Sequence, residues 1–425
     1  LAVLPSTGGN VALYFIDIDP FKQVNDTLGH DGGDFLLSIV GERLRAIVRI
    51  EDMVARLGGD EFVVAQTGIA GKPQAEAFAE RIAEVLSTPS YFKEQEVRPS
   101  FTIGVALAPQ DGVTAERLLK SADLALYEGK TAGRDCIRFF TAEMDEALQK
   151  RITLEKIIRD AVAHDGLVLH YQPVFEMANK HLVGFEALIR LPAPDGTLIP
   201  PDDFLPLAAE MRLIDKIGTW VLGEACRTAI TWPEDLTVAV NLSPAQFESG
   251  LLEDTVADAL KTSGLKPHRL ELEILESLLL ENTEAVMATL KKLKGMGVSI
   301  VMDDFGTGYS SLSYLWKFPF DKIKIDRSFM GSFEKSGRDV ETVVKTIIAL
   351  GREMNMRVTV EGVETSDQVD FLYDADADQV QGFYFGRPMP ASQLKGDVFD
   401  KIHYSAVVPP DATPKLRLVR PSEQR

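Results

Sequence analysis

Side chains that could bind metal ions recur between positions 168 and 386, near the ends of short β-like segments. Eight such segments can be recognised, at 168–175, 182–190, 236–243, 269–277, 298–305, 322–328, 357–364 and 379–386. Near their ends lie Gln172, Glu186, Asn241, Glu273 with Glu276, Asp303 with Asp304, Lys324 with Asp326, Glu361 with Glu364, and Gln381. Carboxylate and amide oxygens are the ligands that hard divalent cations prefer. If these ends meet in space, they form an oxygen-rich metal site that includes a lysine.

Helical stretches separate most of these segments, and this alternation predicts how the acids are brought together. Strands that alternate with helices over such a length indicate an α/β fold with a modified (β/α)8 barrel of the TIM type. The active site of such a barrel lies at the C-terminal ends of its strands. The sequence therefore predicts that the acids converge at one end of a barrel.

The pair Asp303-Asp304 is the sharpest chemical signal in this region. Adjacent residues of a strand point to opposite faces, so both aspartates can serve one site only if the strand ends there. Gly306 and Gly308 indicate that it does. Two metal ions about 3.5–4 Å apart could share such carboxylates and stabilise both oxygens of an in-line displacement.

The residue Lys324 would point into the same site as Asp326, because the two are two positions apart on one strand. A lysine there can orient or help to deprotonate a water molecule, or neutralise charge on phosphate oxygens. The alternative is that the acids are helix N-caps and solvated loop residues, and that the lysine forms an ordinary salt bridge. The repetition over successive strand ends favours the active site.

Composition narrows the classes of ligand. The chain has 425 residues, room for two domains, and a formal net charge of −19. That charge argues against binding of long nucleic acids or anionic membranes, but not of a small phosphorylated ligand, because bound metals reverse the local potential. The two cysteines, Cys136 and Cys226, form no CxxC motif and indicate a reducing, cytoplasmic compartment. We expect no membrane contact from this segment, although an upstream region could anchor a longer protein.

The first 140 residues have the pattern of a separate α+β domain. We predict strands at 11–18, 98–108 and 136–140, helices at 34–48, 73–86 and 114–131, and a hairpin of 53–56 with 61–66. A connecting helix is predicted at 141–164, the barrel at 165–395, and a C-terminal extension and tail at 396–425. The hairpin turn Gly58-Gly59-Asp60 could hold a cation together with Asp17, as nucleotidyl transfer requires. A bare Gly-Gly-Asp is more often an ordinary turn.

The second half of the chain resembles the EAL family of cyclic-di-GMP phosphodiesterases. The resemblance is carried by the motifs Tyr171-Gln172-Pro173, Glu186-Ala187-Leu188, Val240-Asn241-Leu242-Ser243, the run 303–312, Lys322-Ile323-Lys324-Ile325-Asp326, Glu361-Gly362-Val363-Glu364 and Gln381-Gly382-Phe383-Tyr384. It covers essentially all of 150–395.

This resemblance implies a role for each matching residue. The implied metal ligands are Glu186, Asn241, Glu273, Asp303, Asp304, Asp326 and Glu361, with Mg²⁺ or Mn²⁺ as the ion and two ions in the site. The implied catalytic residues are Lys324, Glu186 and Glu361; the implied substrate-binding residues are Gln172, Leu188, Arg190 and Gln381; Glu276 and Glu364 steady the loops. Two positions depart from the family pattern, Leu275 where threonine is usual and Leu191 where tryptophan is common. We expect activity to survive both, with metal affinity altered by the first.

The first domain resembles the GGDEF family of diguanylate cyclases. The matching residues are Asp17-Ile18-Asp19-Pro20-Phe21-Lys22, Asn25-Asp26, Gly29-His30, Gly33-Asp34, Arg56–Phe62, the helix around Asp123–Tyr127, Lys130 and Arg134. The resemblance implies metal binding by Asp17 and Asp60, and GTP binding by Lys22, Asn25, Asp34, Gly58, Gly59, Lys130 and Arg134. Arg49 and Asp52 match an inhibitory site for cyclic-di-GMP. A helix-end salt bridge is the alternative for those two residues.

Three functions are compatible with this sequence. The leading hypothesis is a phosphodiesterase that hydrolyses cyclic-di-GMP to linear pGpG, with a GGDEF domain that binds GTP. In that hypothesis the GGDEF domain can serve as an allosteric sensor of GTP or product rather than as a cyclase. A bifunctional enzyme that also makes cyclic-di-GMP is the first alternative. Synthesis needs two GGDEF domains face to face, so we expect a homodimer, and the family's opening segment is missing before Val11, so we expect little synthesis. A non-catalytic cyclic-di-GMP receptor is the other alternative, and the retained acids and lysine disfavour it.

Overall fold

The computed structural model describes residues 10–19, 21–279, 283–306, 315–394 and 399. Contacts within the chain divide it into two compact units, Leu1–Thr153 and Leu154–Arg425. The boundary falls inside helix α4 (Ala142–Ala163), the element predicted as a connecting helix. Among the described helices, none combines the length and the apolar character that crossing a membrane requires.

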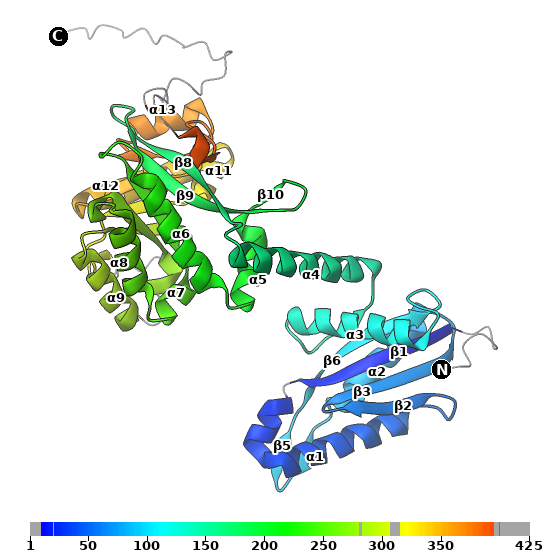
Figure 1. The fold of residues 1–425 in the computed structure, drawn as a ribbon. Coiled ribbons are helices and arrows are strands. Elements are labelled where there is room, and N and C mark those ends of the chain that lie inside the picture. The colour runs from blue at the N-terminus through cyan, green and yellow to red at the C-terminus, as the bar shows by residue number, and fades with distance from the viewer. Residues whose placement is uncertain (1–9, 20, 280–282, 307–314, 395–398, 400–425) are drawn as a thin grey trace, which may run out of the picture. The chain divides into compact units, whose positions relative to one another are not determined.

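The first unit is built on an antiparallel-rich sheet whose central strand is buried on both faces. The strands follow the order β2 (Met53–Gly58), β3 (Glu61–Ile69), β1 (Asn10–Asp19), β6 (Ser100–Ala108) and β7 (Ile137–Phe139). Alternate side chains of β1 point to opposite faces. Tyr14 and its alternates pack with α1 (Phe21–Ile47) and α2 (Lys72–Leu86), whereas Leu13 and its alternates pack with α3 (Ala115–Thr131) (Figure 1). The predicted α+β organisation is confirmed.

Two elements of this unit differ from the sequence prediction. The helix predicted at 34–48 begins earlier, at Phe21, because two helical stretches join at Gly29, whose φ of 75° and ψ of 173° break the helical path. The small hairpin of β4 (Ser90–Phe92) and β5 (Gln95–Val97) was not predicted, since its two strands are only three residues long.

The second unit contains a closed ring of eight strands. Their order is β9 (Leu182–Pro192), β11 (Thr237–Leu242), β12 (Leu270–Leu275), β13 (Ser299–Phe305), β14 (Lys322–Ile325), β15 (Arg357–Val360), β16 (Gln379–Val380) and β8 (Val168–Glu176), and β8 returns to β9. Neighbouring strands are parallel, except that β8 runs antiparallel to both β9 and β16. The predicted modified TIM-type barrel is confirmed, and the antiparallel course of β8 is what distinguishes it from an all-parallel ring. The segment between β8 and β9 is too short for the helix that a parallel crossover needs.

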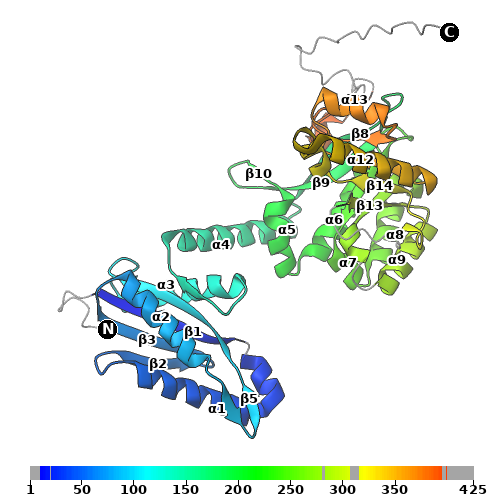
Figure 2. The ribbon, with the colours of Figure 1, turned by 180° about the vertical axis from the view of Figure 1, so that it is seen from behind.

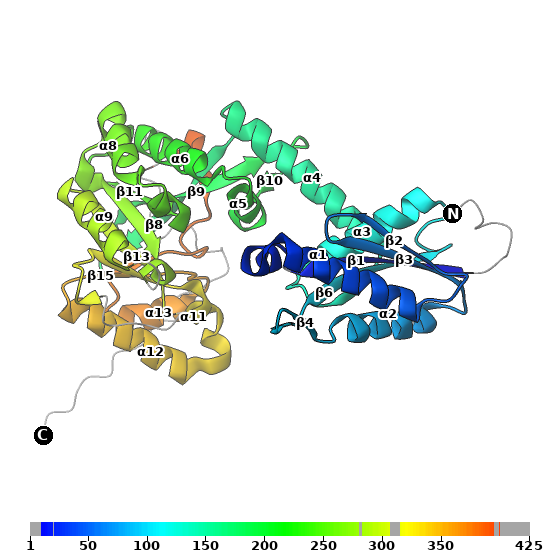
Figure 3. The ribbon, with the colours of Figure 1, turned by 90° about the horizontal axis from the view of Figure 1, so that it is seen from below.

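Helices surround this barrel and cover its outer face. They are α5 (Pro201–Glu210), α6 (Ile214–Ala229), α7 (Pro244–Glu248), α8 (Leu252–Ser263), α9 (Thr283–Gly295), α11 (Arg327–Gly331), α12 (Phe333–Glu353) and α13 (Ser366–Asp374). Figure 3 shows α6, α8, α9 and α12 arranged around the strands. Short strands β10 (Leu198–Ile199) and β17 (Met389–Pro390) extend the sheet beside β9 and β8.

The hydrophobic core of this unit lies outside the barrel, between strands and helices. On β12, Leu270, Leu272 and Ile274 belong to that core. The alternate residues Glu271 and Glu273 are buried as well and face the barrel interior. TIM-type barrels usually fill their interior with bulky branched side chains. In this barrel most of the buried inward-facing side chains are polar, and that interior provides the functional site.

Several predicted strands are shorter than expected, which changes the setting of the acids near their ends. Glu276 opens a short 3-10 helix, Glu276–Leu279, and Asp326 is the N-cap of α11. Glu361 and Gln381 follow immediately after β15 and β16. Most of the loop 303–312 and the tail lie outside the described residues.

Candidate active site in the barrel interior

Lys324 stands at the centre of a buried cluster of acids. Its ammonium nitrogen lies 2.5 Å from Glu361 Oε1, 2.9 Å from Glu273 Oε2, 3.3 Å from Glu186 Oε2 and 3.5 Å from Asp303 Oδ1. The four acids come from β9, β12 and β13 and from the residue after β15. The lysine side chain is only 3% exposed. The predicted convergence of strand-end acids is therefore present, and the lysine belongs to it.

One ammonium cannot balance four carboxylates, and the pKa values reflect this excess of negative charge. Burial raises the pKa of Glu361 to about 8, although Lys324 opposes the shift. Burial also raises the pKa of Glu273 well above its ordinary value. Burial alone would lower the pKa of Lys324, but the surrounding acids raise it well above its usual range. The cluster therefore retains protons near neutral pH unless other cations replace them.

Glu186 is buried, and side-chain amides take the place of water around its carboxylate. Asn241 Nδ2 donates to its Oε1 at 2.7 Å, and Gln381 Nε2 donates to its Oε2 at 2.6 Å. Burial alone would raise the pKa of Glu186, but Lys324 and the two amides lower it below its ordinary value. Gln381 also donates to Gln172 Oε1 at 3.2 Å. The antiparallel β8 thus delivers Gln172 to the same site, opposite Glu186 in the strand register.

A break in the strand pleat lets both aspartates of the pair serve one site. Asp304 has a φ of 55°, a left-handed conformation that few non-glycine residues adopt. The pairing of β13 with β14 shifts register between Met302 and Phe305, where the two strands lie side by side (Figure 2). The sequence prediction that the strand ends at the pair is wrong in detail, because β13 continues to Phe305. A bulge, rather than a strand end, re-aims the second carboxylate.

The donor atoms fit a divalent cation. Within the described residues, one oxygen each of Asp303, Asp304 and Glu361 can be chosen so that all lie within 4.8 Å of one another. Burial raises the pKa of Asp304 to about 6, and the neighbouring Asp303 adds to this shift. These carboxylate oxygens are hard ligands whose negative charges repel one another. A bound Mg²⁺ or Mn²⁺ would neutralise that charge.

Three other predicted residues have identifiable contacts or positions. Asp326 Oδ1 accepts from the Ser328 amide at 3.0 Å, so it caps α11, and its carboxyl also hydrogen-bonds Asp304. Glu276 Oε2 accepts from the Gly306 amide at 3.2 Å and so holds the start of the loop after β13. Glu364 is exposed, and its predicted steadying role stays a prediction.

The two departures from the family pattern lie in different places. Leu275 is the last residue of β12, directly opposite Asp303 in the strand register. Its side chain therefore stands near the acids, as the sequence suggested. Leu191 is fully buried in the core between barrel and helices, so its change does not alter the inner face of β9.

A cavity of about 740 Å³ opens onto these acids. Predicted residues in its wall are Gln172, Glu186, Leu188, Arg190, Asp304, Asp326, Glu361, Glu364 and Gln381. The wall also includes Pro200, Pro201, Asp202, Arg327, Phe383 and Pro388, which the sequence prediction did not assign. Phe383 lies with its ring centroid 4.3 Å from the Arg387 guanidinium carbon. Its position in the motif after Gln381 was the available signal. Pro200 and Pro388 lie on loops, whereas Pro201 and Asp202 begin α5 and Arg327 begins α11, and no residue pattern marks these positions.

The predicted nucleotide site of the first unit is more open. Asp17 is buried at the end of β1, and the Lys130 ammonium lies 2.7 Å from its Oδ2. Burial raises the pKa of Asp17, Lys130 opposes the shift and Asp60 adds to it. The hairpin turn forms as predicted, with Gly59 at a φ of 52° and its carbonyl accepting from the Arg56 guanidinium. The two predicted metal ligands thus influence one another electrostatically.

The predicted guanine-binding residues come from the two stretches of α1. A side chain at Gly33 would meet Asn25 Oδ1 at 2.0 Å, so the glycine permits the close approach of the two stretches. Asp34, next to it, is exposed, as is Lys22. Arg134, predicted to contact phosphate, lies 3.8 Å from buried Asp19.

Asp52 of the predicted inhibitory site is engaged by the backbone. Its two oxygens accept from the amides of Arg49 and Thr67, each at 3.0 Å. Asp52 and the Arg49 side chain line a cavity of about 200 Å³ together with Arg81. Backbone amides, rather than the helix-end salt bridge offered as the alternative, hold Asp52.

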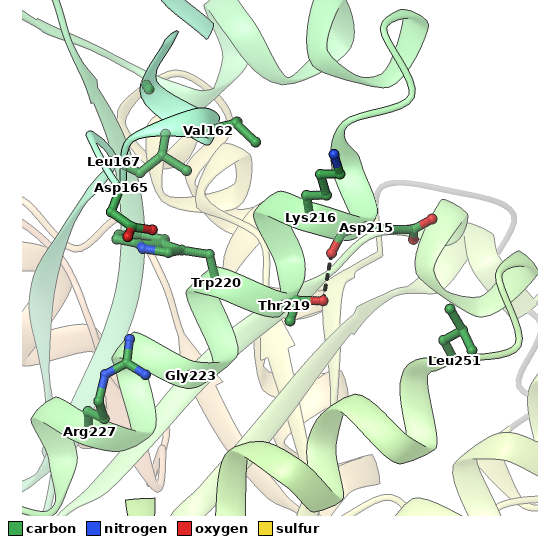
Figure 4. A pocket seen from close by; sticks show the side chains of 11 residues that line it. Val162, Asp165, Leu167, Asp215, Lys216, Thr219, Trp220, Gly223, Arg227 and Leu251 are labelled. Atoms are coloured by element: carbon green, nitrogen blue, oxygen red, sulfur yellow. Dashed lines mark hydrogen bonds between the residues drawn. The ribbon is translucent and has the colours of Figure 1, made fainter. Parts of the chain in front are cut away.

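The second unit has another cavity, of about 570 Å³, on the outer side of α6 (Figure 4). Figure 4 shows Thr219 donating to the Asp215 carbonyl oxygen, a hydrogen bond of 2.8 Å. Arg227 pairs with Glu224 of the same helix at 2.9 Å. These groups are satisfied locally, and the cavity brings together no cluster of acids like that of the barrel.

The fold and the site define a TIM-type barrel protein with an acidic interior, preceded by an α+β domain. Residues 155–388 match the EAL domain, and residues 4–136 match the diguanylate cyclase GGDEF domain. The chain belongs to the EAL family and carries a GGDEF domain before the EAL domain.

Relatives with the same two domains are known from several bacteria. An uncharacterised signalling protein of Caulobacter vibrioides is 45% identical over 392 residues, covering 92% of this chain and 48% of that protein. MucR of Pseudomonas aeruginosa, named a bifunctional diguanylate cyclase/cyclic di-GMP phosphodiesterase, is 44% identical, covering 91% of this chain and 57% of that protein. This chain thus spans about half the length of these relatives. A structure of the MucR phosphodiesterase in complex with c-di-GMP is similar over 57% of this chain and 99% of that one, with 44% identity and a TM-score of 0.55.

Proposed function

We propose that the EAL domain hydrolyses cyclic-di-GMP to linear pGpG in a reaction that depends on a divalent cation. One observation carries the proposal, the buried cluster of four acids around Lys324 at the base of a 740 Å³ cavity. Relatives named as c-di-GMP phosphodiesterases and the c-di-GMP complex of MucR support the choice of substrate. The sequence-derived alternative of a receptor without catalysis is disfavoured, because the lysine and the acids are assembled.

The chain's own groups divide the work of this reaction. Asp303, Asp304 and Glu361 would hold the cation, with Glu186, Asn241, Glu273 and Asp326 completing the predicted ligand set. A bound Mg²⁺ or Mn²⁺ would supply Lewis-acid stabilisation of charge on the phosphate oxygens.

Within this arrangement Lys324 contributes a fixed positive charge in a site shielded from solvent, where such a charge acts strongly. The oxygen of water bonds to phosphorus, the P–O3′ ester bond breaks and the departing 3′ oxygen takes up a proton, so the ring opens to a 5′-phosphate and a 3′-hydroxyl. Asn241 and Gln381 hold Glu186, and Gln172 accepts a hydrogen bond from Gln381. We expect Arg190 and Leu188 in the cavity wall to contact the nucleotide.

Product analysis tests this proposal. The purified chain is incubated with cyclic-di-GMP and Mg²⁺ or Mn²⁺, and the products are separated by chromatography. We expect linear pGpG with either ion and none after chelation. Cleavage without any divalent ion would contradict the mechanism, and binding of cyclic-di-GMP without cleavage would favour the receptor.

We further propose that the GGDEF domain binds GTP with Mg²⁺ beside Asp17 and Asp60. The proximity of the buried Asp17 to Lys130 and to the two-glycine turn supports this proposal. The name of MucR keeps the bifunctional alternative open. Calorimetry with GTP, followed by analysis for cyclic-di-GMP, separates binding from synthesis. Accumulation of cyclic-di-GMP would favour the bifunctional enzyme and a dimer with its two GGDEF domains face to face.

A further inference from the structure

A second buried Lys–Glu pair lies inside the barrel, one step from the catalytic cluster. Lys322 Nζ and Glu271 Oε2 are 2.6 Å apart, and their side chains are only 8% and 9% exposed. Lys322 precedes Lys324 by two residues on β14, and Glu271 precedes Glu273 by two residues on β12. Both pairs therefore face the barrel interior and span the same two strands.

On β13, the strand between them, the inward-facing positions at this level are Ser299, which is opposite Glu271, and Val301. Val301 of β13 is opposite Glu273 on one side and Lys322 on the other, and it is fully buried. The pairs Lys322–Glu271 and Lys324–Glu273 therefore lie one above the other in the barrel, with the apolar side chain of Val301 between them. Same-face positions on a strand are about 6.6–6.8 Å apart, a distance that the flexible lysine side chain can bridge. Either lysine could then reach the acid of the other pair.

Such a pair is not explained by stability alone. A buried ion pair often stabilises a protein no more than apolar side chains of similar volume. Branched apolar residues usually fill this layer of a TIM-type barrel. A need to keep the neighbouring acids free to bind a cation would explain the pair.

We propose that Lys322 and Glu271 are positioning residues that prevent exchange of partners with the cluster above them. With Glu271 as its partner, Lys322 does not compete with a cation for Glu273. With Lys322 as its partner, Glu271 does not draw Lys324 down and away from Glu361. The inference rests on the proposed metal-dependent function, and it predicts that the two halves of the pair protect different properties of the site.

Two single substitutions separate these effects in the full chain. Glu271→Gln frees Lys322, so Mn²⁺ affinity, measured by calorimetry without nucleotide, should fall about tenfold or more, the usual effect of losing a group that orients a ligand. Lys322→Met frees Glu271, so kcat for cyclic-di-GMP should fall while KM and Mn²⁺ affinity stay near parental values. The double variant Glu271→Met with Lys322→Met has no group to exchange and should recover both properties. Lys292→Met, which removes an outer-surface partner of Glu253, is the control and should match the parent.

The outcomes decide between positioning and simple support of the fold. If both single variants lower the melting temperature but keep parental Mn²⁺ affinity and kcat, the pair is structural and the proposal is wrong. If Glu271→Gln does not fold, Glu271→Asp keeps the charge but shortens the side chain, and unchanged Mn²⁺ affinity in it would also overturn the proposal. Should the parent bind Mn²⁺ without cleaving cyclic-di-GMP, the proposed hydrolysis fails, but the Mn²⁺ pattern still tests the pair.

Discussion

The two domains place a lysine against a predicted metal-binding acid in contrasting ways. In the GGDEF domain Lys130 contacts Asp17, and its side chain is 33% exposed. In the barrel Lys324 contacts four acids and is 3% exposed. The arrangement in the barrel arises because strand ends converge inside a closed ring. The arrangement in the GGDEF domain arises because a hairpin turn lies beside one strand. The acids of the barrel site therefore gather around one buried lysine, whereas in the GGDEF domain only Asp17 of the two predicted metal ligands contacts Lys130.

Removal of Lys324 should have the largest effect of the changes considered, and it tests the role of the lysine in the barrel site. Lys324→Ala should lower kcat for cyclic-di-GMP by about 10²–10⁴-fold, the range for loss of a positioned charge or proton-transfer group. Substrate binding should change less, because the lysine is buried below the cavity. Steady-state kinetics and equilibrium binding in Mn²⁺ provide the measurement. A rate equal to that of the parent would show that the acids alone perform the chemistry.

A smaller effect is expected at Glu276, which acts through the backbone of the loop after β13. Glu276→Ala removes the acceptor for the Gly306 amide and should weaken Mn²⁺ affinity by about 10–100-fold through misplacement of Asp303 and Asp304. Calorimetry gives the affinity, and circular dichroism checks that the barrel remains folded. Glu276→Gln retains an acceptor oxygen and is the matched control. Unchanged affinity in the alanine variant would show that the loop holds its place unaided.

The excess of acid in the barrel predicts an unusual pH dependence without metal. The folded-state pKa is about 8 for Glu361 and about 6 for Asp304, both above the ordinary values. An acid with a raised pKa contributes stability that is complete below its unfolded pKa and is lost as pH rises through its folded pKa. The free energy of unfolding should therefore decline as pH rises toward about 8.

Added Mn²⁺ should reverse this trend, because the cation replaces the protons. Thermal unfolding over this pH range, with chelator or with Mn²⁺, measures the effect, and the relevant transition is the one that Mn²⁺ shifts. The stabilisation by Mn²⁺ should increase with pH. A stabilisation independent of pH would mean that the acids are ionised without the metal and that the cluster carries no excess protons.

The sequence predicted much of the barrel site because acids and amides recur near the ends of β-like segments. It could not predict three features that depend on tertiary structure. The left-handed conformation of Asp304 is set by the bulge between β13 and β14 and has no residue signature, since glycines follow it rather than occupy it. The antiparallel course of β8 depends on which strands it pairs with, and that pairing is set by the tertiary structure. The polar layer of Lys322 and Glu271 looks in sequence like the solvated face of an ordinary strand.

The smallest expected effect concerns the GGDEF domain and tests whether its open site communicates with the barrel. If GTP changes the rate of cyclic-di-GMP hydrolysis, coupling energies of about 1–3 kcal/mol are typical and correspond to a several-fold to hundred-fold change in affinity. Asp60→Ala removes one predicted cation ligand on the exposed turn, so it should abolish the GTP response while basal hydrolysis stays at the parental level. Asp26→Ala, an exposed change on α1 outside the predicted ligand set, is the control and should retain the response. Hydrolysis is measured with and without GTP in Mg²⁺, and GTP binding by calorimetry. A response that persists in Asp60→Ala would place GTP elsewhere, and absence of GTP binding to the parent chain would show that the open site does not assemble at all.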